Sequence, residues 1–211
     1  MVKNYKEYIW NDINVCSHRY LFPLVFKIIR DLNLPLDSQI LDAGCGGGRL
    51  VDLVYNSGYK KIYGLDLSDS GIKLAKGAFP RLAGNFFNHD IYKIALPSPS
   101  PQKYDLIIVT DVLEHLYDPR TAIKNIYTWL NKEGYLILAV PYHGYLKNIS
   151  IAALNRFDSH VDSLQEGGHI KFFSKKTLIA LLNSEGFRFM NFYGAGRIPC
   201  CWKSMVAVAK K

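Results

Sequence analysis

The chain has 211 residues, of which 49% are hydrophobic and 21% are charged. This length and composition predict one globular domain with a sizeable core and exclude an intrinsically disordered chain. No apolar run reaches the roughly 18–20 residues that a membrane-spanning helix needs. The N-terminal segment lacks the apolar stretch of a secretory signal peptide, so we expect a cytoplasmic protein without a membrane span.

The formal net charge of +8 suggests an anionic partner such as a nucleic acid. However, the Lys and Arg residues are scattered along the chain, with no more than two in succession. Because a nucleic-acid footprint needs basic residues clustered on one face, this pattern favours a solvated surface. The four cysteines, at positions 16, 45, 200 and 201, form no C-x-x-C pair, which favours reduced thiols over a structural zinc site.

Short apolar runs alternate with segments of helical periodicity along most of the chain. In chain order we expect helix His18–Leu32, strand Gln39–Asp42, helix Gly48–Ser57, strand Lys61–Leu65, helix Asp69–Ala78, strands Gly84–Phe87 and Tyr104–Val109, a helix from Asp118-Pro119 to about Leu130, strand Gly134–Val140, a helix capped by Ser174, and strands Phe187–Tyr193 and Trp202–Ala209. The strands at 104–109 and 134–140 are apolar at consecutive positions, which is typical of a parallel sheet covered on both faces.

Strands that alternate with helices predict an α/β fold, a three-layer doubly wound sandwich that binds ligands at the carboxyl ends of its strands. We expect a single domain over residues 1–211, with an N-terminal helical cap at 1–35. Residues 142–168 fit the alternation poorly, and we interpret them as an insertion or lid over the substrate site.

The glycine-rich segment Asp42-Ala43-Gly44-Cys45-Gly46-Gly47-Gly48 follows the first strand directly and leads into a helix. Glycine lets the backbone approach a ligand closely and adopt positive φ angles, so we expect a nucleotide-binding loop. The G-x-G-x-x-G/A fingerprint of dinucleotide-binding proteins fails here, because its third position falls on Arg49 or Val51. No Gly-Lys-Ser/Thr follows, which excludes a P-loop.

The pattern D-x-G-x-G-x-G at Asp42, Gly44, Gly46 and Gly48 resembles the first motif of class I S-adenosylmethionine (SAM)-dependent methyltransferases. The resemblance implies a Rossmann-like, seven-stranded and mostly parallel sheet with an antiparallel terminal strand. It also implies SAM as cofactor and S-adenosylhomocysteine (SAH) as product.

Polar residues at the ends of the next three strands extend this resemblance. It implies that the carboxylate after the second strand holds the ribose hydroxyls and that an acidic residue after the third strand faces the adenine. The further cofactor-binding candidates at these strand ends are Asp66, Leu67, Asp90, Ile91, Thr110 and Asp111.

The segment Thr110-Asp111-Val112-Leu113-Glu114-His115-Leu116 resembles that of quinone-biosynthesis O-methyltransferases. That resemblance implies a possible divalent-metal site at Asp111, Glu114 and His115; the alternative is that Glu114 and His115 brace the following loop. His115, His143 and His169 are candidate general bases, because an imidazole titrates near neutral pH. A structural hydrogen-bonding role is the alternative for each.

The resemblance implies a methyltransferase, and the missing nucleic-acid features favour a small-molecule acceptor, with a hydroxyl oxygen as the expected target. We expect a monomer or homodimer. An RNA methyltransferase is an alternative, although no Asn/Asp-Pro-Pro-Tyr phrase for holding a flipped base follows the fourth strand. The other alternative is a SAM-binding regulatory protein without catalytic activity, because a glycine loop indicates that the cofactor binds but not that its methyl group is transferred.

Overall fold

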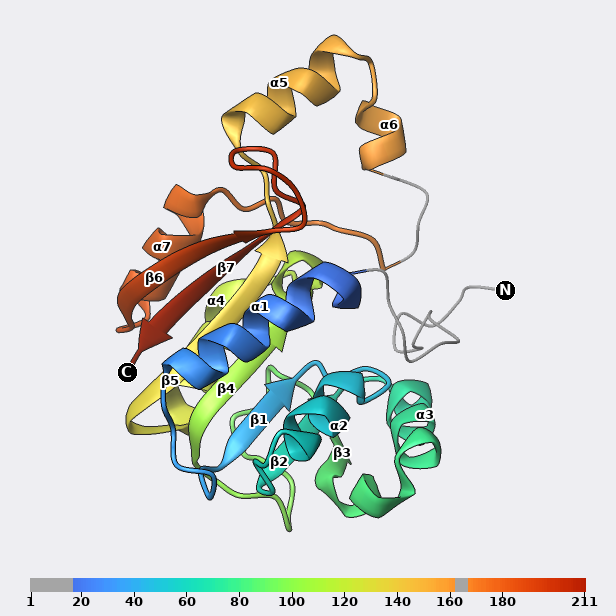
Figure 1. Cartoon of the computed structure of the whole chain (residues 1–211), viewed down its shortest axis with the longest axis vertical. Coiled ribbons are helices and arrows are strands. Elements are labelled where there is room, and N and C mark those ends of the chain that lie inside the picture. The colour runs from blue at the N-terminus through green and yellow to red at the C-terminus, as the bar shows by residue number, and fades with distance from the viewer. Residues whose placement is uncertain (1–16, 162–166) are drawn as a thin grey trace.

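A computed structural model describes residues 17–161 and 167–211 (Figure 1). Residues 1–16 of the predicted helical cap, including Cys16, and residues 162–166 of the predicted insertion lie outside the described residues. The strands are β1 (Ile40–Ala43), β2 (Ile62–Asp66), β3 (Phe86–Asn88), β4 (Tyr104–Thr110), β5 (Leu130–Pro141), β6 (Arg188–Ala195) and β7 (Ser204–Lys210). The α-helices are α1 (His18–Asp31), α2 (Arg49–Asn56), α3 (Asp69–Ala78), α4 (Pro119–Trp129), α5 (Tyr145–Ala153), α6 (Phe157–His160) and α7 (Lys175–Ser184), and the 3-10 helices are η1 (Pro80–Asn85) and η2 (Leu113–His115).

The seven strands form one sheet in the order β3-β2-β1-β4-β5-β7-β6. Strands β1 to β5 pair with one another in parallel, whereas β7 pairs antiparallel with both β5 and β6. The predicted α/β fold with a mostly parallel seven-stranded sheet and an antiparallel terminal strand is therefore confirmed. None of the described helices is both long and apolar enough to cross a membrane.

Helices cover both faces of this sheet, which makes the molecule a three-layer sandwich (Figure 1). Along β4, Leu106 and Ile108 belong to a core shared with α1, α2 and α3, whereas Ile107 and Val109 belong to the core under α4 and α7. All four side chains are fully buried. Strand side chains alternate between the two faces, so a strand covered on both sides must be apolar throughout, which explains the continuous apolar run.

The helices predicted to begin at Asp118 and Ser174 both start there, with these residues as caps. The Asp118 carboxylate accepts the Thr121 N–H, and Ser174 forms a capping box with Thr177. A side chain that caps a helix in this way satisfies N–H groups that have no partner within the helix.

Several strand boundaries differ from the sequence prediction by one or more residues, and the starts of β3 and β5 have a clear structural cause. β3 begins at Phe86, because Gly84 and Asn85 complete η1, which Pro80 starts with a fixed φ angle. β5 begins at Leu130, and its pairing with β4 shifts register between Tyr104 and Leu106. Glu133, with a φ of 69°, belongs to this irregular part of the strand. After Leu130, the first residues of β5 are polar, so the apolar run that predicted the strand does not include them.

Candidate functional site

The carboxyl ends of the parallel strands meet at one edge of the sheet, which we call the carboxyl edge. The strand order reverses between β1 and β4, which are adjacent in the sheet although β2 and β3 separate them in the chain. Ligands of doubly wound folds bind at such a switch point. The polar residues selected from the sequence follow β1, β2, β3, β4 and β5, so the fold brings them to this edge.

The glycine loop, residues 44–48, connects β1 to α2. Gly44, Gly46 and Gly48 have φ angles of 92°, 49° and 78°, where glycine is favoured. A Cβ atom at Gly44 would overlap the Val112 side chain, and one at Gly48 would lie 2.7 Å from the Phe86 ring. The sequence suggested that these glycines permit close approach of a ligand; at Gly44 and Gly48, neighbouring side chains also leave no room for a Cβ.

Asp66, at the end of β2, supports the glycine loop. One carboxylate oxygen accepts the Gly46 N–H at 2.8 Å, and the other accepts the Ser68 N–H at 2.8 Å. Burial raises the pKa of Asp66, while these two hydrogen bonds act in the opposite direction. A carboxylate has about four acceptor sites, so each oxygen retains capacity for a ligand hydroxyl. This geometry fits the expected ribose contact.

Asp42, the first residue of the motif, is 2% exposed at the end of β1. Its Oδ1 atom has no hydrogen-bond partner among the described residues. Burial, with the Asp66 charge as a second cause, raises the pKa of Asp42 to about 8. A buried acid of this kind fits a cationic or hydrogen-bond-donating ligand group, because such a group would favour its charged form.

The other predicted cofactor-binding residues lie farther along the same edge. Leu67 is 37% exposed after β2. Asp90 accepts the Tyr92 N–H at 3.0 Å, and the carbonyl of Ile91 accepts the Asn125 side-chain amide. Thr110 is the last residue of β4 and is half-buried. These positions could line an adenosine site next to the glycine loop.

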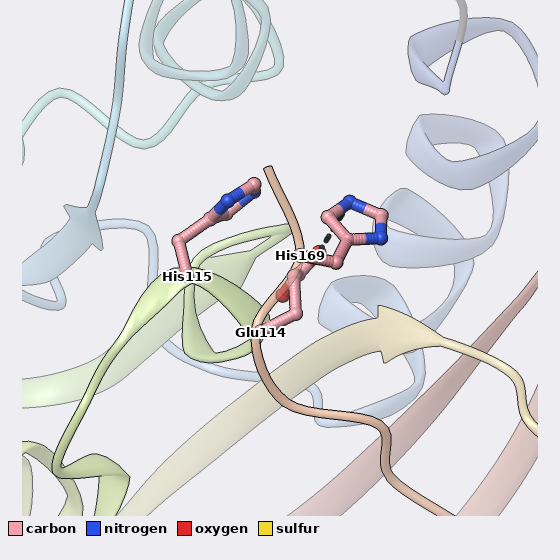
Figure 2. Close-up of side chains that lie close together, drawn as sticks. All are labelled: Glu114, His115 and His169. Atoms are coloured by element: carbon pink, nitrogen blue, oxygen red, sulfur yellow. Dashed lines mark ion pairs between the residues drawn. The ribbon is translucent and has the colours of Figure 1, made fainter. Parts of the chain in front are cut away.

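Three ligand-type side chains gather after β4: Glu114, His115 and His169, here called the Glu114 cluster (Figure 2). One ligand atom from each lies within 4.8 Å of the others. Glu114 is 1% exposed, and neither carboxylate oxygen has a hydrogen-bond partner among the described residues. His169 Nε2 lies 3.9 Å from Glu114 Oε1, which is beyond hydrogen-bonding distance. The cluster therefore presents a buried acid and two imidazoles with free ligand capacity.

Backbone hydrogen bonds clamp the segment that carries His169 onto the turn after β4. The Glu114 carbonyl accepts the N–H groups of Ile170 and Lys171, at 2.8 and 3.0 Å. The His115 ring nitrogen Nδ1 lies 3.2 Å from the Gly168 carbonyl oxygen. Two segments more than fifty residues apart are thus held together, and the three side chains of the cluster are pre-positioned.

Burial, reinforced by the nearby Asp111 charge, raises the pKa of Glu114 well above its usual value. Burial also lowers the pKa of His169 to about 4, and His115 adds to this effect. Both pKa shifts favour the neutral form of the group concerned, so the 3.9 Å approach is a weak ion pair in the absence of a ligand. A divalent cation fits this arrangement, because it would favour the deprotonated carboxylate and the neutral imidazoles that ligate metals.

Asp111 lies outside this cluster, although the sequence resemblance placed it with Glu114 and His115. Its backbone is left-handed, with a φ of 53°, and its N–H donates to the Ala139 carbonyl at 3.1 Å. Its pKa is raised by burial, while a side-chain hydrogen bond with Ser17 lowers it. The structure brings His169 into the place expected for Asp111.

His143, the third candidate base, follows β5 and contacts Phe172 and His160, with ring centroids 5.0 and 5.8 Å away. Burial, followed by the charge of Lys147, lowers its pKa to about 4. Neither Lys147 nor His160 was expected from the sequence. His143 precedes α5, so helical spacing does not relate it to Lys147, and the contact with His160 has no local signature.

Comparison with known proteins agrees with this geometry. A family model described as a methyltransferase domain matches residues 17–190. The ubiquinone biosynthesis O-methyltransferase of Coxiella burnetii is 29% identical over 131 residues, covering 62% of this chain and 55% of that protein. Its counterpart from Nitrosospira multiformis is 35% identical over 125 residues, covering 53% and 51%. The chain thus spans about half the length of these curated relatives.

Solved structures share the fold. The magnesium protoporphyrin IX methyltransferase of Synechocystis PCC 6803, solved with bound SAH, has a TM-score of 0.67 and 22% identity over 90% of this chain and 81% of its own. A SAM-dependent methyltransferase from Mesorhizobium loti has a TM-score of 0.70 and 17% identity, covering 95% of this chain and 100% of its own.

The match over residues 17–190 and the seven-stranded fold place this chain in the methyltransferase domain family, as a class I SAM-dependent methyltransferase. The predictions of family, fold class and SAM as the family's cofactor are confirmed, and methyl transfer is the reaction that gives this family its name.

Proposed function

We propose that this protein transfers the methyl group of SAM to a hydroxyl oxygen of a small-molecule acceptor, at a site where the Glu114 cluster holds a divalent cation. The observation that carries the proposal is the cluster itself: a fully buried carboxyl group whose oxygens have no partner among the described residues, held beside two imidazoles. The O-methyltransferase names of the curated relatives support a hydroxyl acceptor.

The glycine loop and the residues of β1 and β2 would hold SAM, which supplies a methyl group activated by its sulfonium. The glycine-loop backbone fits the methionine part, Asp66 fits the ribose, and Asp42 fits a cationic or donating group. These residues orient the methyl group toward the acceptor. Alignment of the reacting atoms is worth roughly 7–11 kcal/mol in such displacements, so binding alone accounts for much of the catalysis.

The acceptor hydroxyl must lose its proton when the methyl group is transferred. A divalent cation held by Glu114, His115 and His169 would supply the Lewis acidity that lowers the pKa of a hydroxyl. One carboxylate oxygen and two imidazole nitrogens suit zinc, iron or manganese. The neutral state of His169 near pH 7 leaves its ring nitrogen able to act as a ligand or to accept a proton.

The test is SAH formation from SAM with a panel of phenols, sugars and lipids that carry free hydroxyls, before and after dialysis against a chelator. We expect turnover to need added Mn²⁺ or Zn²⁺. We also expect Glu114→Gln to lower turnover by about 10²-fold or more, by analogy with the loss of other electrostatic catalytic groups, with unchanged SAH affinity by calorimetry.

Glu133→Gln is the matched control, because Glu133 lies at the opposite edge of the sheet and pairs with Lys210. Turnover that is indifferent to chelation and to Glu114→Gln would overturn the metal-assisted hydroxyl mechanism. Transfer to tRNA in preference to the whole panel would overturn the small-molecule acceptor, and tight SAH binding without transfer to either would favour a regulatory role.

A further inference from the structure

A second group of basic side chains lies beyond the Glu114 cluster, and three separate segments contribute to it. His143 precedes α5, Lys147 lies in the first turn of α5, His160 ends α6, and Arg197 lies in the turn between β6 and β7. We call these four residues the cationic cluster. Figure 1 shows α5 and the β6–β7 turn close together beyond the carboxyl edge of the sheet.

Direct contacts and electrostatic interactions link the members of the cationic cluster. The His143 and His160 rings lie with their centroids 5.8 Å apart. The Lys147 ammonium donates to the Tyr142 carbonyl at 2.7 Å, which fixes its position in a half-buried setting. Burial and then the Arg197 charge lower the pKa of Lys147, and burial followed by Lys147 and Arg197 lowers that of His160.

Among the described residues, no carboxylate forms an ion pair with a member of the cationic cluster; the ion pairs of this part of the chain lie elsewhere. The charged groups that act on the pKa values of His143, Lys147 and His160 are all lysine, arginine or histidine side chains. Gathering like charges in a partly desolvated place costs free energy. An anion supplied from outside the chain would offset that cost.

The position of the cationic cluster points to the methyl acceptor as the source of this anion. The Phe172 ring contacts His143, and the two residues just before Phe172, Ile170 and Lys171, donate their N–H groups to the Glu114 carbonyl. An anionic group bound here would therefore lie close to the reacting centre. The Phe172 ring contacts His143 edge-on and is 46% exposed, so it offers an apolar surface beside the cations.

We propose that the cationic cluster binds an oxyanion, a carboxylate or a phosphate ester, of the methyl acceptor, whose apolar body lies against Phe172. This inference rests on the proposed function, because it places the acceptor beside the Glu114 cluster. Lys147 and Arg197 provide the positive charges, and the imidazole N–H groups of His143 and His160 can donate hydrogen bonds to the anion.

The experiment measures the binding of benzoate, phenyl phosphate and benzamide to the SAH-saturated chain by NMR titration. Benzamide matches benzoate in shape but is uncharged. We expect benzoate, phenyl phosphate or both to bind at least about tenfold more tightly than benzamide, the factor expected for one charge-assisted contact, and to lose this advantage as salt rises. The anion that binds more tightly indicates whether the acceptor carries a carboxylate or a phosphate ester.

The double variant Lys147→Met/Arg197→Met should abolish the preference for anions, and Arg197→Met alone should weaken it without removing the Lys147 bond to Tyr142. Lys132→Met, an equal loss of charge near the start of β5, is the matched control and should keep the preference. Equal binding of benzoate and benzamide would overturn the inference. It would also be overturned if the preference for anions survived in the double variant, or if Lys132→Met lowered that preference as much as the double variant does. Because these titrations need no methyl transfer, their failure is distinct from a failure of the proposed function.

Discussion

Two buried carboxyl groups at the carboxyl edge, those of Asp42 and Glu114, have oxygens without hydrogen-bond partners among the described residues. Leaving a buried polar atom unpaired costs about 1–3 kcal/mol, and most buried polar atoms in proteins are paired. Both acids lie where the proposed ligands bind, one beside the glycine loop and one beside two histidines. We infer that these unpaired oxygens destabilise the ligand-free protein and that they are present because they bind ligands.

Gly44 offers a test of the glycine loop at the level of a single residue. Gly44→Ala should destabilise the chain by about 1–3 kcal/mol and weaken SAH binding, because the methyl group meets Val112 and the φ of 92° strains an alanine. Chemical denaturation and calorimetry measure the two effects. Adding Val112→Ala removes the clash but leaves the strained φ, so it should restore only part of the loss. Full recovery, or no effect of Gly44→Ala, would contradict this account.

The residues of the cofactor site could be predicted because each follows a strand at a position fixed by a local pattern. Gly44 and Asp66 are recognisable from their immediate neighbours alone. The pairing of His169 with Glu114 could not be predicted in this way, because it depends on backbone hydrogen bonds from Ile170 and Lys171 to the Glu114 carbonyl. A contact between segments so distant in the chain has no local signature.

At the scale of elements, helix starts were the most predictable feature, since the capping side chain and the helix are adjacent in sequence. Helix α7 illustrates this point, because Ser174 and Thr177 satisfy each other's backbone N–H groups. The same cap fixes the end of the segment that carries His169. The position of that histidine is therefore linked to the start of α7.

Ser174→Ala should lower the free energy of unfolding by about 1 kcal/mol, the usual loss for an N-cap hydroxyl. The midpoint of urea unfolding measures this effect. Ser150→Ala is a suitable control, because Ser150 bonds only the carbonyl one turn earlier within α5, and its loss should change stability little. An equal effect of both substitutions would argue against the capping box as the source of stability.

Helices α5 and α6 were less predictable than the others. No described residue of α5 is buried, and Tyr145, Leu146 and Ile149 are 77%, 51% and 46% exposed. Helical periodicity in a sequence reflects one face packed against a core, so a helix without a buried face gives a weak signal. The sequence therefore indicated an insertion at 142–168 but not its helices.

At the scale of the whole molecule, the shifted pKa values predict how stability depends on pH. Asp42 has a pKa of about 8 when folded, so the folded chain binds a proton that the unfolded chain releases near pH 4. Stability from this group therefore falls as pH rises toward 8. His143 and His169, with folded pKa values of about 4, act oppositely, because they lose stability only as pH falls below about 6.5.

Between pH 7 and 8 His143 and His169 are mostly neutral in both states, so Asp42 outweighs them in the pH dependence. We expect the free energy of unfolding of the ligand-free chain to fall by about 1 kcal/mol across this window, within the limit of about 1.4 kcal/mol per pH unit for one proton. Asp42→Asn should flatten the slope, raise stability at pH 8 and weaken SAM binding. A slope that is unchanged in Asp42→Asn would show that Asp42 does not titrate in this range.

The position of β7 constrains the order in which the sheet can assemble. β7 follows β6 in the chain but lies between β5 and β6, and within the described sheet β6 pairs with β7 alone. As ribosomal synthesis proceeds, β6 emerges with no site at which to dock until β7 is also made. The two strands must therefore join β5 as a preformed hairpin, or β7 must dock first. Until then β5 presents an open edge, so the interval between the two strands is the period when the nascent chain is most exposed to wrong pairing.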